Sequence, residues 1–254
     1  MVTEPLVDLP WDTQDSSTVS GAELSGAYRL KDFPGSSHRI LADWVKNLPP
    51  AAKVLEIGVG ADPFAQLVRR GDLHWLGVDA GVSSLGAIRR TLTGGVIADA
   101  ELLAALPTNR GAVILADTLE HLVDPERMLQ VVFRALDERG TLLLSVPNVA
   151  HWAIRLSLLC GRFDYSDRGI LDRTHRTFFT RRSMREMLSR NRFVVVHEAF
   201  SSVPLPFALP RAPKILVVAL ERLQRAAIWI LPGVFAYQLL VLARARQDCP
   251  PIHD

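Results

Sequence analysis

Short apolar runs alternate with segments of helical periodicity along residues 53–147. The apolar runs are rich in Val, Ile and Leu and predict five buried strands, at 54–58, 74–80, 95–100, 112–118 and 141–147. Between them, helices are predicted at about 62–71, 83–91, 100–106 and 124–137. Because helical crossovers join the strands, the pattern predicts a doubly wound α/β fold, a parallel sheet with helices on both faces.

The pattern changes on both sides of this region. Residues 36–48 predict a helix that begins after a serine pair and ends before two prolines. After Pro147, helices are predicted at 148–160 and 181–191, and apolar runs predict strands at 193–200 and 234–245. The last two strands leave no room for a regular parallel crossover. We therefore expect an antiparallel C-terminal pair that carries a helical insertion at 201–233.

Composition supports one globular domain. Hydrophobic residues make up 48% and charged residues 22% of the 254 residues, which is ordinary for a protein with a buried core. Residues 1–25 are polar without periodicity and predict a flexible leader, which leaves residues 26–254 as a single domain. The N-terminus lacks a signal-peptide pattern, and charges interrupt the longest apolar stretch, 215–231. The sequence therefore predicts a cytoplasmic protein.

Charge and cysteine content exclude some classes of partner. The formal net charge is only +2, so the whole chain does not demand a polyanion. The first 150 residues are net acidic and the remainder is net basic, which reflects either surface variation or an anionic partner of the C-terminal part. Two distant cysteines cannot form a disulfide framework or a zinc set, and no His, Asp or Glu group has clear metal-ligand spacing. No metal site is predicted.

The first predicted strand leads into a glycine-containing loop. Gly58 and Gly60 allow the backbone to approach a ligand, and the helix that follows offers free amide groups. A dinucleotide fingerprint requires a third glycine where this chain has Pro63. This departure disfavours a nicotinamide or flavin dinucleotide.

Acidic residues follow the next three strands. Asp79, Asp99 and Asp117 come at or next to the ends of predicted strands, where the ligand crevice of a parallel sheet lies. Asp79 is suited to accept hydrogen bonds from ribose hydroxyls, and Asp99 from an adenine amino group. Asp79 and Asp99 each have an alternative role as a helix cap. Acids at four consecutive strand ends, counting Glu56, are harder to explain by capping alone.

The series VLEIGVGADPFAQL, LGVDA, IADAE and ILADTLEHLVDPERMLQVVFRALDERGTLLLSVPN resembles class I S-adenosylmethionine-dependent methyltransferases over residues 52–148. It is most similar to the branch with ubiquinone-type O-methyltransferases and methyltransferases found with polysaccharide-biosynthesis enzymes. The resemblance implies a seven-stranded sheet and S-adenosylmethionine as cofactor. It departs from the branch at Asp62, where many relatives have a third glycine.

The resemblance also implies roles for individual residues. Glu56, Gly58 and Gly60 would line the methionine and ribose side of the cofactor, and Asp79 would bind the ribose hydroxyls. The adenine would be held by Asp99 with Ala100, and the methionine moiety would be bordered by Asp117 with Thr118.

Residues 148–180 lie on the side where an acceptor would enter. The stretch GRFDYSDRGILDRTHRTFFTRRSM at 161–184 resembles the polysaccharide-associated branch, in which a Thr-His pair precedes Phe-Phe-Thr. His175 is the candidate general base, because imidazole accepts a proton near neutral pH. A structural hydrogen-bonding role is its alternative, and His121 and His151 are weaker candidates.

Three arginines of the same stretch suit an anionic acceptor. Arg168, Arg173 and Arg176 are candidates to bind a phosphate or carboxylate, or else they pair with neighbouring aspartates.

Residues 214–231 predict an amphipathic helix, either a lid on its own domain or an interfacial helix at a membrane surface that would suit a lipid-linked acceptor.

These observations together predict methyl transfer to a hydroxyl oxygen of a sugar, glycolipid or isoprenoid-type compound. A degenerate domain that acts as a scaffold and a nucleotide-dependent oxidoreductase are the alternatives. Nucleic acid is not an expected partner, because Asp117-Thr118-Leu119-Glu120 replaces the signature that binds flipped bases.

Overall fold

A computed structural model describes residues 30–33, 35–60, 62–81, 84–205 and 209–246. The predicted leader at 1–25 lies outside the described residues. The strands are β1 (Lys53–Ile57), β2 (His74–Asp79), β3 (Gly94–Ile97), β4 (Arg110–Ala116), β5 (Leu136–Pro147), β6 (Phe193–Ser201) and β7 (Gln238–Ala245). The α-helices are α1 (Ser37–Lys46), α2 (Ala65–Val68), α3 (Leu85–Thr91), α4 (Pro125–Ala135), α5 (Trp152–Leu159), α6 (Arg181–Arg190), α8 (Lys214–Ile230) and α9 (Pro232–Phe235). Two 3₁₀ turns are η2 (Ala100–Leu102) and η3 (Leu119–His121).

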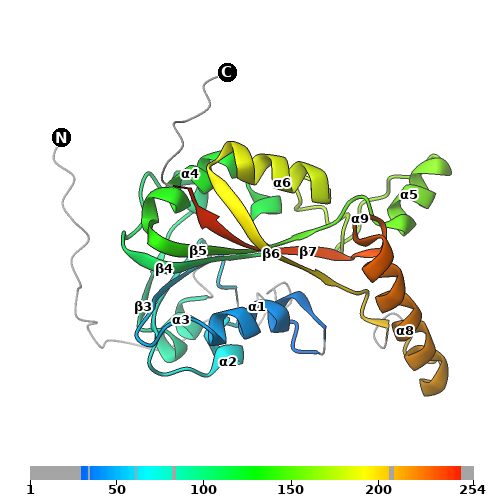
Figure 1. The fold of residues 1–254 in the computed structure, drawn as a ribbon, viewed down its shortest axis with the longest axis horizontal. Helices are drawn as coiled ribbons and strands as arrows, with labels where there is room; N and C mark the ends of the chain where they lie inside the picture. The colour runs from blue at the N-terminus through cyan, green and yellow to red at the C-terminus, as the bar shows by residue number, and fades with distance from the viewer. Residues whose placement is uncertain (1–29, 34, 61, 82–83, 206–208, 247–254) are drawn as a thin grey trace, which may run out of the picture.

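The seven strands form one sheet in the order β3-β2-β1-β4-β5-β7-β6 (Figure 1). Strands β1 to β5 pair in parallel, and β7 lies antiparallel between β5 and β6. The predicted fold class, including the antiparallel C-terminal pair, is therefore confirmed. The order of the parallel strands turns back at β1: β2 and β3 lie on one side of it, and β4 and β5 lie on the other. In such sheets the ligand crevice lies outside the carboxyl ends of the strands at this point.

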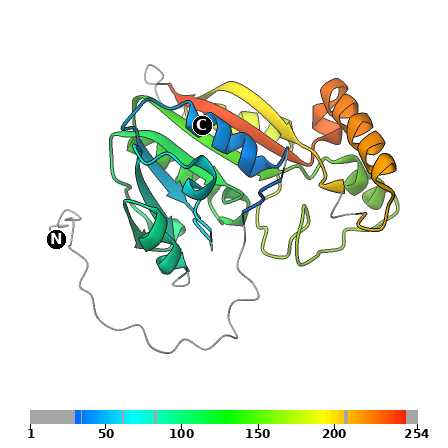
Figure 2. The same cartoon turned by 90° about the horizontal axis from the view of Figure 1, so that it is seen from below.

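Helices cover both faces of the sheet, with α4 and α6 on one face and α1, α2 and α3 on the other (Figures 1 and 2). Alternate residues of each strand point to opposite faces. Val54 and Ile114 pack with α1 and α2, whereas the neighbouring Leu55 and Val113 pack in the core beneath α4 and α6. Because both faces are covered, the middle parts of the central strands are apolar, as in Val113–Leu115 of β4 and Leu142–Leu144 of β5.

Several element bounds differ from the sequence prediction. The helix expected at 62–71 is the single turn α2, and Arg69 ends it in a left-handed conformation with φ of 52°. The segment expected to be helical at 100–106 is only the short turn η2. The strand expected at 234–245 begins at Gln238, because Pro232 starts the helix α9. Strand β5 begins at Leu136, five residues earlier than expected, because it pairs with Arg110 across an irregularity.

Helices α5, α8 and α9 lie together at one end of the molecule (Figure 1). Since α5 follows directly after β5, this is the carboxyl end of the parallel strands. Of the 17 residues of α8, Ile228 is the one that is buried. Helix α8 therefore leaves most of its apolar side chains exposed.

Candidate active site

The loop after β1 has the backbone conformation that its glycines permit. Gly58 and Gly60 have φ of 81° and 64°, in the left-handed region that favours glycine. A Cβ atom added at Gly58 would lie 2.7 Å from the hydroxyl oxygen of Thr118. Thr118 donates that hydroxyl to the carbonyl of Ile57 at 2.9 Å, so the β1 and β4 loops are joined at this position. A side chain at Gly58 would separate them.

Glu56 lies beneath this loop. Its Oε1 accepts the amide of Phe64 at 2.9 Å, and its Oε2 accepts the indole N–H of Trp75 at 2.9 Å. Burial raises the pKa of Glu56 to about 8, although the hydrogen bonds from Phe64 and Trp75 favour the charged form. The carboxyl group is therefore bonded to the protein and supports the turn from β1 into α2.

Asp79 joins the first two strand ends. Its Oδ2 accepts the amide of Gly60 at 2.7 Å, and its Oδ1 accepts the amide of Gly81 at 2.7 Å. The side chain thus orders the two loops and does not cap α3, whose N-cap is Ser84. A carboxylate oxygen has two lone pairs. Each oxygen of Asp79 therefore retains the capacity to accept a ribose hydroxyl.

Asp99 and Ala100 follow β3. Asp99 is exposed and caps η2, because its Oδ1 accepts the amide of Glu101 at 2.9 Å. Ala100 lines a small pocket of about 170 Å³ together with Leu103 and Leu122. This pocket lies between the turns that follow β3 and β4.

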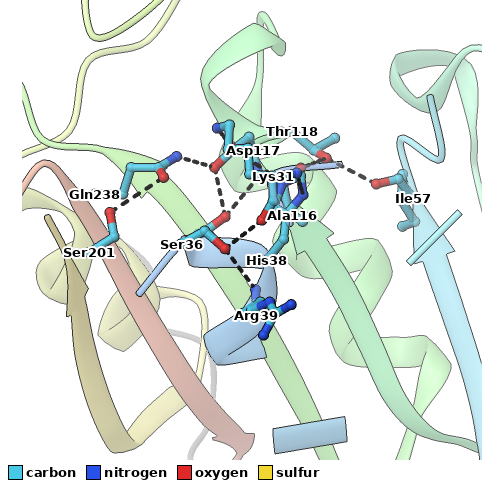
Figure 3. Close-up of polar contacts among 11 residues, drawn as sticks. Lys31, Ser36, His38, Arg39, Ile57, Ala116, Asp117, Thr118, Ser201 and Gln238 are labelled. Atoms are coloured by element: carbon cyan, nitrogen blue, oxygen red, sulfur yellow. Dashed lines mark hydrogen bonds and ion pairs between the residues drawn. The ribbon is translucent and has the colours of Figure 1, made fainter. Parts of the chain in front are cut away.

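Asp117 is at the centre of a buried polar cluster, shown in Figure 3. Its Oδ1 accepts the Ser145 hydroxyl and the Gln238 amide, each at 2.7 Å. Its Oδ2 forms an ion pair with the Lys31 ammonium and lies 3.6 Å from Nε2 of His38. Burial disfavours the charged form, but Lys31 and His38 outweigh it and hold the pKa of Asp117 far below its usual range. Protein groups therefore already neutralise this carboxylate.

A second buried cluster follows β4 and is formed with the segment after α5. The carbonyl of Glu120 accepts the consecutive amides of Arg176 and Thr177, at 2.7 and 3.0 Å. These bonds bring His175 against η3, where its ring lies edge to face with that of His121 at a centroid distance of 4.8 Å. Glu120 and His175 are both buried, with 1% and 6% of their surface exposed.

The electrostatic environment of this cluster is unusual. Burial, together with the nearby charges of Asp117 and Asp172, raises the pKa of Glu120 well above its usual value. Nδ1 of His175 lies 3.0 Å from the carbonyl of Ile170, which assigns the ring proton to Nδ1. The lone pair of the neutral ring is therefore on Nε2, the atom needed by a base or a ligand.

A family model described as a methyltransferase domain matches residues 33–198, which span α1 to most of β6 and include Asp117 and the whole second cluster. The chain belongs to the methyltransferase-domain family.

Solved structures share the fold of this methyltransferase domain at low sequence identity. A SAM-dependent methyltransferase from Archaeoglobus fulgidus is 15% identical, with a TM-score of 0.55, and the match covers 83% of this chain and 95% of that one. A SAM-dependent methyltransferase from Methanosarcina mazei is 13% identical, with a TM-score of 0.54 and coverage of 80% and 97%. The [4+2]-cyclase SpnF is 16% identical, with a TM-score of 0.55 and coverage of 82% and 80%. No curated protein matches the sequence.

The predicted arginines lie on the surface of the methyltransferase domain beside the second cluster. Arg168, Arg173 and Arg176 are exposed, and Arg173 pairs with the equally exposed Asp167 at 3.1 Å. That pairing is the alternative which the sequence left open for Arg173. The structure brings the backbone of Arg176 to Glu120 and leaves its side chain at the surface.

Sequence reasoning missed the partners of Asp117. Lys31, His38 and Gln238 come from segments 86, 79 and 121 residues away, and no local motif marks them. It also found no metal-ligand spacing, whereas the fold gathers Glu120, His121 and His175 within ligand distance of one another. Spacing failed because 54 residues separate the two histidines.

Proposed function

We propose that this methyltransferase domain transfers a methyl group from S-adenosylmethionine to a hydroxyl oxygen of a small acceptor, of the sugar, glycolipid or isoprenoid class. One observation carries the proposal. At the carboxyl edge of the sheet, the loop bearing Gly58 and Gly60 joins the β4 turn, which in turn contacts the buried cluster around His175. A site for an adenosyl group and a site for deprotonating a hydroxyl thus share one strand end.

The residues present fit an adenosyl cofactor. Gly58 and Gly60 leave backbone in place of side chains at the loop, and Gly58 is exposed. Asp79 lies at the end of β2 with capacity for the ribose hydroxyls, and Ala100 lines the pocket on the adenine side. When bound, the cofactor supplies a methyl group already activated by its sulfonium, which becomes a thioether as the carbon–oxygen bond forms.

The protein's own task is then to hold the acceptor and to take its proton. Nε2 of His175 is suited to accept that proton, since Ile170 holds the ring with its proton on Nδ1. His175 is buried, so water competes poorly for the same lone pair. His121 lies partly exposed beside it and forms the boundary with solvent.

An open groove beside α5 and α6 supports an anionic acceptor. Arg155, Arg181, Arg182 and Arg185 line it, together with Glu186 and the start of α9. Arg182 pairs with Glu186, and Arg181 and Arg185 both pair with Glu198, so four arginines face two carboxylates there. Apolar side chains are exposed on the adjoining helices, among them Leu159 on α5 and Ile215 and Trp229 on α8. Basic groups next to exposed apolar groups suit an anionic lipid surface. We therefore propose a peripheral membrane contact through 214–231. None of the helices that the structure describes has the length and hydropathy to cross a membrane.

Calorimetric titration with S-adenosylmethionine and S-adenosylhomocysteine tests the cofactor, with NAD(H) and NADP(H) as controls. Micromolar binding of the adenosyl ligands alone supports the proposal, and tight dinucleotide binding contradicts it. A panel of hydroxylated sugars, glycolipids and quinone precursors then tests the acceptor, with methylated product detected by mass spectrometry. Cofactor binding without turnover on the panel would favour a scaffold.

The variant His175→Ala separates the two halves of the site. It should lower turnover by about 100-fold or more while cofactor affinity changes little. The matched variant His151→Ala removes another buried histidine, whose ring contacts Tyr237 and Trp152, and should lower turnover far less. Equal activity of His175→Ala and the wild type would remove His175 from the reaction.

A further inference from the structure

The side chains of Glu120 and His121, at the end of η3, lie close to the side chain of His175. Glu120, His121 and His175 each offer one potential ligand atom, and these atoms all lie within 4.8 Å of one another. Two of the three residues are buried, and His121 is half-buried. Ligands at about 2 Å from a metal lie roughly 3–4 Å apart, so small side-chain adjustments would bring these atoms around one ion.

The buried atoms of this cluster have no other partner among the described residues. Both carboxylate oxygens of Glu120 and Nε2 of His175 are inaccessible to solvent and make no hydrogen bond within that part of the chain. A buried carboxylate without a donor is strongly unfavourable. Protonation of Glu120 would leave an O–H group and a ring nitrogen still unpaired at the observed geometry. A bound cation satisfies all three atoms at once.

Backbone carbonyls orient both rings as in known metal sites. Nδ1 of His175 faces the carbonyl of Ile170 at 3.0 Å, and Nδ1 of His121 faces the carbonyl of Thr174 at 3.3 Å. An Nδ1–H bonded to a carbonyl directs the Nε2 lone pair to a metal and makes it a better ligand. The amides of Arg176 and Thr177 fix the same segment to Glu120, so the ligands are held before any ion arrives.

We propose that Glu120, His121 and His175 bind one divalent first-row transition ion, with Zn²⁺ as the best match. Two imidazoles and a carboxylate suit such an ion better than Mg²⁺ or Ca²⁺, which prefer oxygen ligands. Three protein ligands leave at least one position open. His121 is partly exposed, which gives an ion a route from solvent.

The role of this ion in turnover rests on the proposed function. A hydroxyl that coordinates to a cation loses its proton more readily, because the positive charge stabilises the alkoxide. In the metal-bound site the Nε2 lone pair of His175 would bind the ion, so the ion would replace His175 as the group that promotes loss of the hydroxyl proton, which would pass to solvent. Without the ion, His175 keeps the role of proton acceptor. Binding of the ion itself does not depend on this role and is tested separately.

The test is equilibrium dialysis of the full chain, free of any histidine tag, against buffered Zn²⁺, followed by metal analysis. We expect about one ion per chain. The variants Glu120→Gln, His121→Ala and His175→Gln should each lower the affinity by more than about 100-fold. The matched variant His151→Gln loses a buried histidine whose Nε2 is also unpaired and should bind Zn²⁺ as the wild type does.

Co²⁺ substitution supplies a second readout, since an intense visible absorption indicates nitrogen ligands in a four- or five-coordinate site. His121→Ala is the variant least at risk of misfolding, because His121 is partly exposed. Circular dichroism checks the fold of each variant. A wild-type chain that binds no Zn²⁺, or variants that retain wild-type affinity, would overturn the proposal. Cofactor binding and turnover in metal-free protein would leave the proposed function standing and remove the ion's role in it.

Discussion

The imidazole rings of His121 and His175 meet edge to face with their centroids 4.8 Å apart. One ring comes from the turn after β4, and the other from the segment before α6. Their contact joins the segment after α5 to the turn that follows β4.

Asp79 is expected to be essential for cofactor affinity. Asp79→Ala removes the proposed acceptor for the ribose hydroxyls and also the bonds from Gly60 and Gly81 that order the loop. Binding of S-adenosylhomocysteine should weaken more than tenfold, about 1.4 kcal/mol or more, as measured by calorimetry. Asp72→Ala, which removes an aspartate paired with Arg70 at the surface, is the control and should leave affinity unchanged. Unchanged affinity in Asp79→Ala would exclude this role.

Glu56 should make the fold less stable as the pH rises. Its pKa of about 8 in the folded state exceeds the ordinary value of 4.5. Between these values the folded protein retains a proton that the unfolded chain has lost, so the free energy of unfolding falls with increasing pH. The fall should be ~2 kcal/mol between pH 6 and pH 8. Glu56→Gln, which stays uncharged, should lack this component when both proteins are unfolded with urea at each pH. Parallel pH profiles would contradict the prediction.

The Lys31–Asp117 ion pair should be a major local contribution to stability. The side chain of Asp117 is 1% exposed and that of Lys31 25%. Lys31→Met would leave a buried carboxylate with less compensation and should cost about 3 kcal/mol of unfolding free energy. The double variant Lys31→Met, Asp117→Asn should recover part of that loss.

Lys46→Met is the control for this pair. Lys46 pairs with Asp43 at 2.8 Å on the surface, where both side chains are well exposed. Its loss should cost less than about 1 kcal/mol. If Lys31→Met and Lys46→Met lost the same unfolding free energy, the buried pair would contribute no more to stability than the surface pair. The pKa of Asp117 is lower in the folded protein than in the unfolded chain, so ionised Asp117 stabilises the fold at pH values above the unfolded-state pKa. This contribution to the unfolding free energy should be lost as the solution is acidified.

Helix α8 should bind anionic membranes if the proposed peripheral contact exists. Ile215 and Trp229 are 83% and 84% exposed, so changing both to serine should leave the unfolding free energy within about 0.5 kcal/mol of the wild type. Sedimentation with vesicles containing phosphatidylglycerol should show affinity reduced about tenfold or more. Leu102→Ser, at an equally exposed site on η2, is the control. Equal sedimentation of all three proteins would argue against a membrane contact through α8.

The sequence by itself determined the central sheet and the positions of the cofactor candidates. Runs of Val, Ile and Leu marked the buried strands β1, β2, β4 and β5, and a shorter apolar run marked the partly exposed β3. Glycine and aspartate at the strand ends marked the carboxyl edge. Both signals are properties of neighbouring residues. The antiparallel pairing of β6 and β7 was also predicted, because their connection does not have the pattern of the regular crossovers that join β1 to β5. The lengths of α2 and η2 did not follow, since packing and loop geometry end them before the local periodicity does.

Only the tertiary structure decided what the polar side chains contact. Asp79 bonds to Gly60 across 19 residues, Asp117 to Gln238 across 121, and the amides at 176 and 177 reach the carbonyl of Glu120. Such contacts depend on the order of the strands in the sheet and on where the segment between α5 and α6 packs against the strand ends. Local sequence carries no signal for either, and the convergence of Glu120, His121 and His175 is therefore a property of the fold.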